Sequence, residues 1–180
     1  MATSEITHCL QPVNQYSHPL IFALPPHAKL IFDHCLKQGS KNNLGMFIAH
    51  RGEIAMYLGI DHDFVHDFFL TNPDLVGFDQ KTHTIWIKPF YDFVDYGLRS
   101  QLRKKVKSKE TGEIIEIIDR WARDRKNNFI SKVLATFKKQ ESFQVFLKEW
   151  VEYNRELLLQ INEVKNIKGN NRHNFDKILT

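Results

Sequence analysis

The residues with the clearest potential for chemistry are two histidines one helical turn apart. His62 and His66, in the run HDFVH, have the spacing with which one helix face can hold zinc. Asp63 stands where the metalloprotease motif has its general-base glutamate, and no third ligand follows. We therefore interpret the pair as part of a solvated polar face, and we expect neither a metal nor a cofactor.

No other set of residues has the spacing of an enzyme's active site. The sequence contains no phosphate-binding glycine loop and no nucleophile elbow, and its nine histidines are dispersed. Its two cysteines, Cys9 and Cys35, fit neither a metal motif nor a disulfide framework. Cys35 falls on the apolar side of an expected helix, so both are predicted to be reduced thiols. These observations predict a protein that is not an enzyme.

The strongest electrostatic feature is a run of positive residues in the second half of the chain. Six Lys and Arg occur from position 99 to position 109 without an acid, and a second group surrounds Trp121. Such clusters can neutralise nucleic-acid phosphates and release counterions, without sequence specificity of their own. The alternative is that they solvate one helix face. The DNA-binding residues predicted in these two groups are Arg99, Arg103, Lys104, Lys105, Lys107, Lys109, Arg120, Arg123, Arg125 and Lys126.

The net charge of the chain is divided unequally. Residues 1–90 hold six Lys and Arg against eight Asp and Glu, a balance of −2. Residues 91–180 hold nineteen against thirteen, a balance of +6, which accounts for the overall charge of +4. The surplus of positive charge therefore belongs to the C-terminal half.

A helix, a tight turn and a second helix are predicted between residues 44 and 73. Apolar residues spaced by three and four predict a first helix that ends at Gly59. Asp61 is a good N-cap for a second helix, which Asn72-Pro73 ends. β-Branched and aromatic residues then flank a polar turn at 79–83, and this pattern predicts a hairpin.

The segments before and after this centre complete the predicted fold. Pro25-Pro26 predicts the start of a helix that runs to Gly39, and 44–47 is predicted to be a short strand that pairs with the hairpin. The fold class is therefore mainly α with a small β-hairpin, a winged helix-turn-helix followed by a helical C-terminal region. Helices are expected at 114–122, at 129–137 and, as one long helix starting from Ser142, to residue 164.

Four regions are predicted along the chain. Residues 1–27 form an N-terminal arm, in which 20–24 is a short strand or docking segment, and residues 28–90 form the winged helix-turn-helix domain. Residues 91–166 form a helical basic region, and residues 167–180 form a flexible tail. No apolar run approaches the roughly 20 residues of a membrane span and no secretion signal is present, so a cytoplasmic protein without membrane contact is expected.

Several motifs resemble the N-terminal winged-helix domain of DnaD-like phage replication proteins, the replisome organisers. The motifs are KLIF at 29–32, LGMF at 44–47, EIAMYLGI at 53–60 and TIWIKPF at 84–90. In that family a GxF/Y strand, an IA…LG helix and an IWIKNF-like wing strand recur, and Pro89 stands where Asn is frequent. The resemblance covers residues 28–90 and implies a winged-helix fold and a role in DNA replication.

The second helix of the predicted helix-turn-helix has an unusual charge for a DNA-reading element. It contains Asp61, Asp63 and Asp67, and no Lys or Arg occurs from 61 to 75. Carboxylates repel a polyanion, whereas a recognition helix normally presents basic or amide side chains to the major groove. Either the DNA contacts come from elsewhere, or the fold serves here to bind a protein or to oligomerise.

Three functions follow from these observations. The first is a non-enzymatic DNA-binding protein of phage or plasmid replication initiation or regulation, which self-associates as a homodimer or larger oligomer. The second is an inhibitor or adaptor that uses the winged helix to bind a host replication or regulatory protein. The third is a dimeric transcriptional repressor, whose contacts with its operator would come from Lys81 and Lys88 in the wing and from Arg51.

Overall fold

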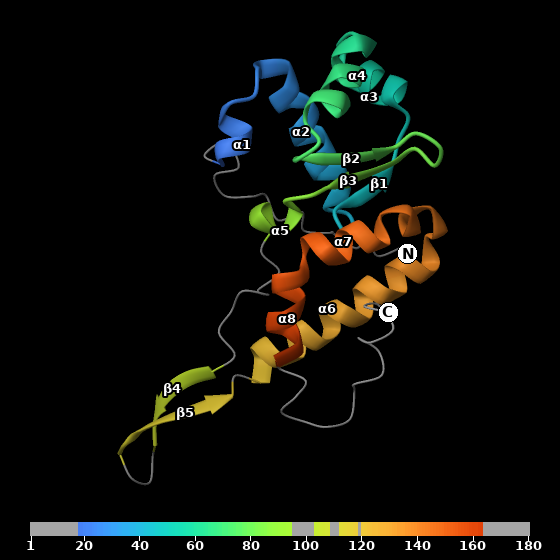
Figure 1. The fold of residues 1–180 in the computed structure, drawn as a ribbon. Helices are drawn as coiled ribbons and strands as arrows, with labels where there is room; N and C mark the ends of the chain where they lie inside the picture. Colours follow the sequence, from blue (N-terminus) through green and yellow to red (C-terminus); the bar gives the residue numbers. More distant parts are fainter. Residues whose placement is uncertain (1–17, 95–102, 109–111, 119, 164–180) are drawn as a thin grey trace, which may run out of the picture. The chain divides into compact units, whose positions relative to one another are not determined.

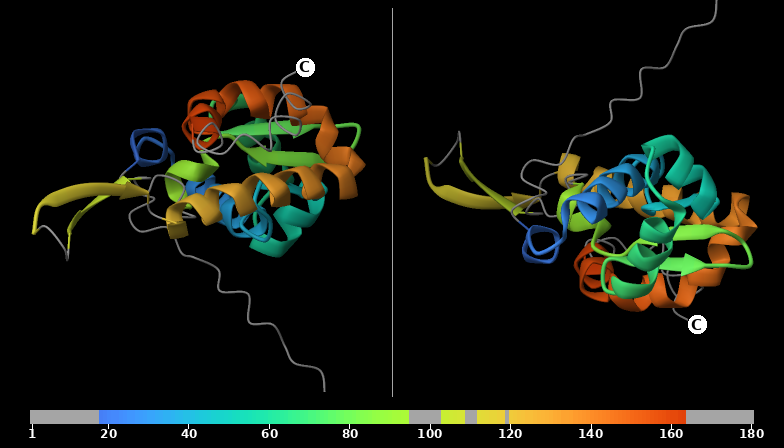
Figure 2. Two further views of the ribbon diagram at one scale, coloured as in Figure 1. Left: turned by 90° about the horizontal axis from the view of Figure 1, so that it is seen from below. Right: turned by 90° about the horizontal axis from the view of Figure 1, so that it is seen from above.

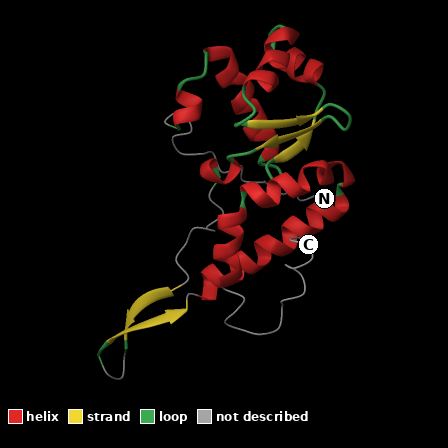
Figure 3. Cartoon of the chain, in the orientation of Figure 1, coloured by secondary structure: helices red, strands yellow, loops and turns green. Residues whose placement is uncertain are grey.

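The computed structural model describes residues 18–94, 103–108, 112–118 and 120–163. Helices make up most of it, with a three-stranded and a two-stranded antiparallel sheet (Figures 1 and 3). The chain divides into two compact units, the first from residues 1–95 and 135–148 and the second from residues 96–134 and 149–180. Across the described ranges, no helix combines the length and the apolarity that crossing a bilayer requires.

Two helices begin the first unit, and both start at a proline. α1 spans Pro19–Phe22 and α2 spans Pro26–Gly39, each with proline in the first turn, where its missing amide proton costs nothing. The predicted boundaries of α2 are confirmed, but the short strand that was one of the two alternatives predicted at 20–24 is wrong. Ile21 instead anchors the short α1, with none of its surface exposed.

The helix-turn-helix segment forms as the sequence predicts. α3 (Arg51–Leu58) ends at Gly59, which adopts a left-handed conformation with φ of 64°. Asp61 then caps α4 (His62–Thr71), because its Oδ1 accepts a hydrogen bond of 2.9 Å from the backbone amide of Asp63. The buried residues Val65, Phe68 and Phe69 give α4 its core face.

Three short strands make one sheet in the order β1-β3-β2. β1 (Met46–Ile48) and β2 (Val76–Asp79) both pair antiparallel with β3 (Thr84–Ile87), which is therefore the central strand. Two pairs fix the register, Ile48 with Thr84 and Gly77 with Trp86. The strand predicted just before α3 and its pairing with the hairpin are thus confirmed, and β2 and β3 lie side by side in both views of Figure 2.

The central strand is buried on both of its faces. α2 packs against β3, and the 3-10 helix η2 (Glu141–Phe146) packs against the face that carries Thr84 and Trp86. The Thr84 hydroxyl donates a hydrogen bond of 3.2 Å to the carbonyl of Ser142, and the Phe146 ring lies 5.7 Å from that of Trp86. Residues 28–90 are therefore not the whole of this unit, because a segment some 50 residues later completes its core.

A short helix closes the first unit after the sheet. α5 spans Phe90–Phe93, and the Phe90 side chain is fully buried. The Tyr91 hydroxyl donates a hydrogen bond of 2.5 Å to the carbonyl of Asn43, which joins α5 to the loop before β1. The aromatic run after the hairpin is thus a packed part of the unit.

The second unit differs from the helical region predicted at 91–166. Residues 103–107 and 114–118 form strands, β4 (Arg103–Lys107) and β5 (Ile114–Ile118), and the helix predicted at 114–122 is wrong in its first half. Four isoleucines in five residues favour a strand, since β-branched side chains lose rotamer freedom in a helix. Gly112, with φ of 72°, provides the turn between the two strands.

The structure has several shorter helices where one long helix was predicted from Ser142 to residue 164. α6 (Arg120–Lys139) is continuous, with Phe129, Val133 and Phe137 buried at helical spacing. After η2, α7 (Leu147–Tyr153) and α8 (Arg155–Glu163) are separated at Asn154. The Asn154 amide group donates a hydrogen bond of 2.8 Å to the carbonyl of Trp150, a local bond that competes with helix continuation.

The position of Cys35 leads to a prediction about its reactivity. Its side chain is fully buried in α2, and burial raises the pKa of the thiol far above its usual range. In a Cys9→Ser variant, we expect Cys35 to react with Ellman's reagent roughly a thousandfold more slowly in the folded protein than in urea, because reaction requires unfolding. Equal rates in the two states would contradict the burial. Cys9 itself lies outside the described residues.

Candidate nucleic-acid interface

The basic residues predicted to bind DNA are distributed over three elements of the described chain. Lys104, Lys105 and their neighbours lie on β4, four of the predicted residues lie on α6, and three lie around the β2–β3 hairpin. Arg99 and Lys109 lie outside the described residues. The positions are Arg103, Lys104, Lys105 and Lys107 on β4; Arg120, Arg123, Arg125 and Lys126 on α6; and Arg51, Lys81 and Lys88 in the first unit.

The β4–β5 hairpin concentrates positive charge on one strand. The register pairs Arg103 with Ile118, Lys105 with Glu116 and Lys107 with Ile114. Alternate positions of a strand belong to one face of a sheet, so Arg103, Lys105 and Lys107 share a face. Glu116 is the one acid that the two strands contain, and it stands opposite Lys105. The two strands therefore carry a net positive charge, with four Lys or Arg against one Glu.

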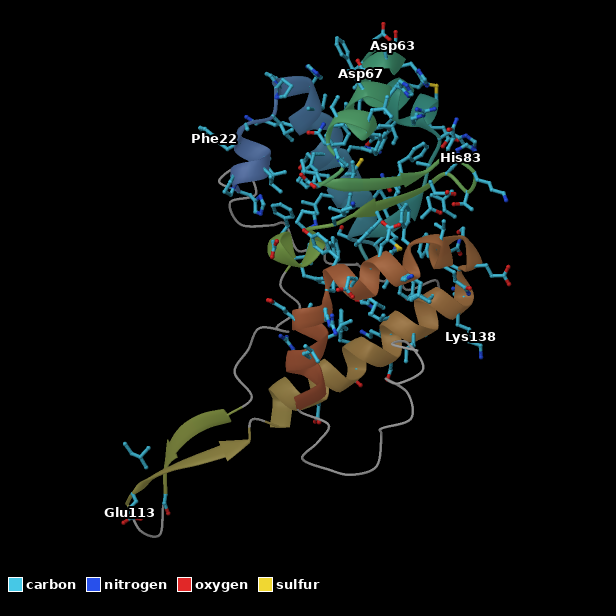
Figure 4. The ribbon with its side chains drawn as sticks, in the orientation of Figure 1. Phe22, Asp63, Asp67, His83, Glu113 and Lys138 are labelled. Atoms are coloured by element: carbon cyan, nitrogen blue, oxygen red, sulfur yellow. The ribbon has the colours of Figure 1, made fainter. Side chains whose placement is uncertain are left out.

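α6 contributes further basic residues, and the boundary between the two units divides it after Leu134. Asp124 and Arg125 are exposed in its N-terminal half. Further along, the exposed lysines Lys138 and Lys139 occupy the last turn, where positive charge complements the partial negative charge of a helix C-terminus (Figure 4).

The third basic group surrounds the β2–β3 hairpin of the first unit. Arg51, at the start of α3, donates a hydrogen bond through Nη1 to Nδ1 of His66 on α4, and its guanidinium lies 5.2 Å from the Phe78 ring centroid. The rings of His50, the residue before Arg51, and of His83 lie 3.8 Å apart. We call His50, Arg51, His66, Phe78 and His83 the β2–β3 cluster.

The turn between β2 and β3 is held by its own side chains. The Asp79 carboxylate accepts hydrogen bonds of 2.6 Å from the Thr82 hydroxyl and 2.7 Å from the Thr82 amide, and these bonds lower the pKa of Asp79. Asp79 is therefore directed onto its own turn. Lys81, between the two, is exposed.

Lys88, which follows β3, is engaged with the core rather than extended from it. Its Nζ lies 5.7 Å from the Trp86 ring centroid, and its backbone amide donates a hydrogen bond of 3.0 Å to the Leu75 carbonyl. Half-buried Lys88 and exposed Lys81 thus differ in their availability to a ligand.

The acidic residues of α4 face a different side of the unit from the β2–β3 cluster. Figure 4 shows Asp63 and Asp67 at the end of the unit formed by α3 and α4, whereas His83 lies at the β2–β3 turn. Both carboxylates are exposed, while Asp61 serves as the N-cap. The outward surface of α4 is therefore negative, as its sequence predicts.

The histidines of α4 do not form a metal pair in this structure. His66 Nδ1 accepts the hydrogen bond from Arg51, and His62 Nδ1 lies 3.9 Å from the Asp63 carboxylate. In the part of the chain that the structure describes, no three His, Cys, Asp or Glu side chains come close enough to hold a metal ion.

The closeness of His50 and His83 was not predicted from the sequence, although a signal for it existed. The two residues are 33 positions apart and belong to no motif. Once β1 is paired with β3, however, the residues that follow β1 must lie beside those that precede β3. The Ala49 amide indeed donates a hydrogen bond of 3.1 Å to the His83 carbonyl.

Comparison of the chain with family models, with curated proteins and with solved structures finds no significant match.

Proposed function

We propose that this protein binds DNA without enzymatic activity and that its N-terminal unit is a winged helix-turn-helix. The order α2, β1, α3, α4, β2, β3, the tight turn at Gly59 and the β1-β3-β2 sheet support this assignment, with β2–β3 as the wing. The resemblance of residues 28–90 to replisome organisers favours a role in initiating or regulating phage or plasmid replication, and hence a cytoplasmic site of action.

The basic β4 strand is the observation that carries the proposal. Four of its five residues are Lys or Arg, and they lie on a two-stranded ribbon. The major groove of B-DNA is wide enough to admit such a ribbon, and its flanking phosphates attract the positive residues. The β4–β5 ribbon supports DNA binding better than the basic helix that was predicted from the sequence. The ribbon can enter the major groove by itself, so binding needs no contact from α4.

α4 does not serve as the DNA-reading helix in this proposal. Its exposed face carries Asp63 and Asp67, which would meet phosphates of the same charge. Binding is therefore expected to depend on phosphate contacts and to discriminate weakly between sequences.

The test is the affinity of the whole chain for random duplex and single-stranded DNA at two salt concentrations. We expect the variant Arg103→Ala/Lys105→Ala/Lys107→Ala to bind duplex DNA roughly 100-fold or more weakly at 0.1 M salt. The slope of log K against log salt should also fall by roughly 2.7, since each phosphate contact contributes about 0.9. Fluorescence anisotropy measures both quantities.

A second triple variant removes the same charge elsewhere. Lys138, Lys139 and Lys148 are exposed and lie outside the hairpin, so their replacement by alanine should change the affinity less than fivefold through long-range effects alone. Equal losses in the two triple variants would show a non-local effect of net charge and count against the hairpin. Absence of binding at 0.1 M salt would reject the proposed function.

A protein-binding function is the second candidate, and the surface near α4 favours it. Met56, Tyr57 and Leu70 are 80%, 74% and 64% exposed in the same unit as the α4 carboxylates. The Tyr57 ring packs on His34, whose pKa is lowered mainly by burial, so this contact stays uncharged at neutral pH. Retained biological activity in a chain that does not bind DNA would favour this candidate.

A further inference from the structure

The rings of His50 and His83 form a close pair of ionisable side chains in the described part of the first unit. Their centroids lie 3.8 Å apart with the ring planes inclined by 39°. Imidazole is the side chain that ordinarily gains or loses a proton between pH 5 and 8. Two imidazolium rings at this distance repel each other, so an anion bound beside them would relieve the repulsion.

Hydrogen bonds fix the backbone of both residues before any ligand arrives. His50 is the N-cap of α3, and its amide donates a hydrogen bond of 3.0 Å to Oε2 of Glu53. His83 has a φ of 53°, the left-handed conformation, and its carbonyl accepts the Ala49 amide. Because the strand register and the helix start set their positions, the backbone of the two residues needs little reorganisation when a ligand binds.

Arg51, which follows His50 in the chain, carries a permanent positive charge. A guanidinium can only donate hydrogen bonds, so His66 Nδ1 must be the unprotonated acceptor in their contact. His66 and the Phe78 ring thus position Arg51, one residue from His50. A cluster with a fixed guanidinium favours an anionic ligand over a metal cation.

We infer that the β2–β3 cluster is a binding site for a phosphate group of nucleic acid, and that His50 and His83 take up protons as the phosphate binds. This inference deepens the proposed function by giving the first unit its own DNA contact, separate from β4. Charged groups of both signs lie close to the pair along the chain. The Glu53 carboxylate accepts the His50 amide and the Asp79 carboxylate accepts the Thr82 amide, while Arg51 is one residue from His50 and Lys81 is two residues from His83.

The inference predicts a pH-dependent affinity for duplex DNA. Linked uptake that averages about half a proton between pH 6 and pH 8 should make binding roughly tenfold tighter at pH 6 than at pH 8, at constant salt. Because seven other histidines are present, the comparison needs matched variants. His50→Asn/His83→Asn removes both rings, and asparagine suits both an N-cap and a left-handed residue. His27→Asn is the control, because the His27 ring packs on Phe64 of α4, outside the cluster.

The expected result is that the His50→Asn/His83→Asn variant changes affinity less than twofold between pH 6 and pH 8, while the His27→Asn control keeps the full tenfold change. A double variant that keeps the wild-type pH dependence overturns the inference, as does wild-type binding that depends on salt but not on pH. The second outcome leaves the proposed function standing.

An NMR titration with sulfate tests the site independently of DNA. Sulfate keeps its charge between pH 6 and pH 8, so only the protein titrates. At pH 6 we expect the ring resonances of His50 and His83 to shift together and those of His27 to stay in place. If DNA binding fails altogether but these shifts occur, the proposed function falls and the anion site stands; absence of the shifts overturns the site.

Discussion

Replacing Gly45 by alanine is expected to destabilise the protein by roughly 3 kcal/mol or more, the larger of two glycine effects in the first unit. Gly45 has a φ of 68°, which costs a residue with a side chain about 1–2 kcal/mol. An added Cβ would also lie 2.7 Å from Phe90 Cβ and 2.8 Å from Phe90 Cδ2. Phe90 is fully buried and cannot move aside without disturbing the core, which adds about 1–3 kcal/mol.

Gly59→Ala is the matched control for this substitution. Gly59 has nearly the same backbone conformation, with φ of 64°, but a Cβ there would meet no atom within 4 Å. Its loss should be limited to about 1–2 kcal/mol. Urea denaturation followed by circular dichroism gives both free energies of unfolding. Equal losses at the two glycines would show that Phe90 does not confine Gly45.

These two glycines illustrate which parts of the fold are visible in the sequence. Gly59 and Asp61 mark the end of α3 and the start of α4 through local chemistry, a left-handed residue and a capping carboxylate, and both were predicted. The role of Gly45 depends on Phe90, which is remote along the chain and meets it only through the fold. The residues that begin and end helices are therefore predictable from the sequence, whereas the spatial neighbours of a given residue are not.

The β4–β5 hairpin shows how two patterns can compete in one segment. The apolar positions Ile114, Ile115, Ile117 and Ile118 fit a helical stripe as well as the two opposite faces of a strand. β-Branching and the turn at Gly112 decide in favour of the strand. The density of lysine and arginine on β4 concealed its strand period, because the positive residues occupy both faces.

The basic residues of the candidate interface were predicted from their charge, but the residues that only the fold brings together were not predicted. Runs of Lys and Arg are visible in a sequence, so the residues of β4 and α6 were identified. Histidines contribute no formal charge at pH 7, and the proximity of His50 to His83 arises from the pairing of β1 with β3. The pairing of β1 with β3 was itself predicted. Comparing the residues just beyond the ends of these two strands would have placed His50 beside His83.

Phe146→Ala is the second substitution for which we expect a large effect. Phe146 lies in the segment 135–148, which belongs to the first unit although no local sequence pattern assigns it there. Phe146 is buried against Trp86, and its Cε1 lies 3.0 Å from the position of a Cβ at Gly77. Replacing it by alanine leaves a cavity over the sheet and should lower the free energy of unfolding by roughly 3 kcal/mol. For a protein of this size, the melting temperature should fall by roughly 6–12 °C.

The neighbouring Val145→Ala provides the control, since Val145 is 46% exposed on the same 3-10 helix and should lose less than about 1 kcal/mol. The fluorescence of Trp86 supplies an independent measurement in a chain whose other two tryptophans, Trp121 and Trp150, are replaced by phenylalanine. In that background, Phe146→Ala should shift the emission of the folded protein to longer wavelength, because Trp86 gains contact with water. Unchanged emission together with unchanged stability would mean that η2 does not cover the sheet. The domain would then be complete within residues 28–90, as the sequence alone predicts.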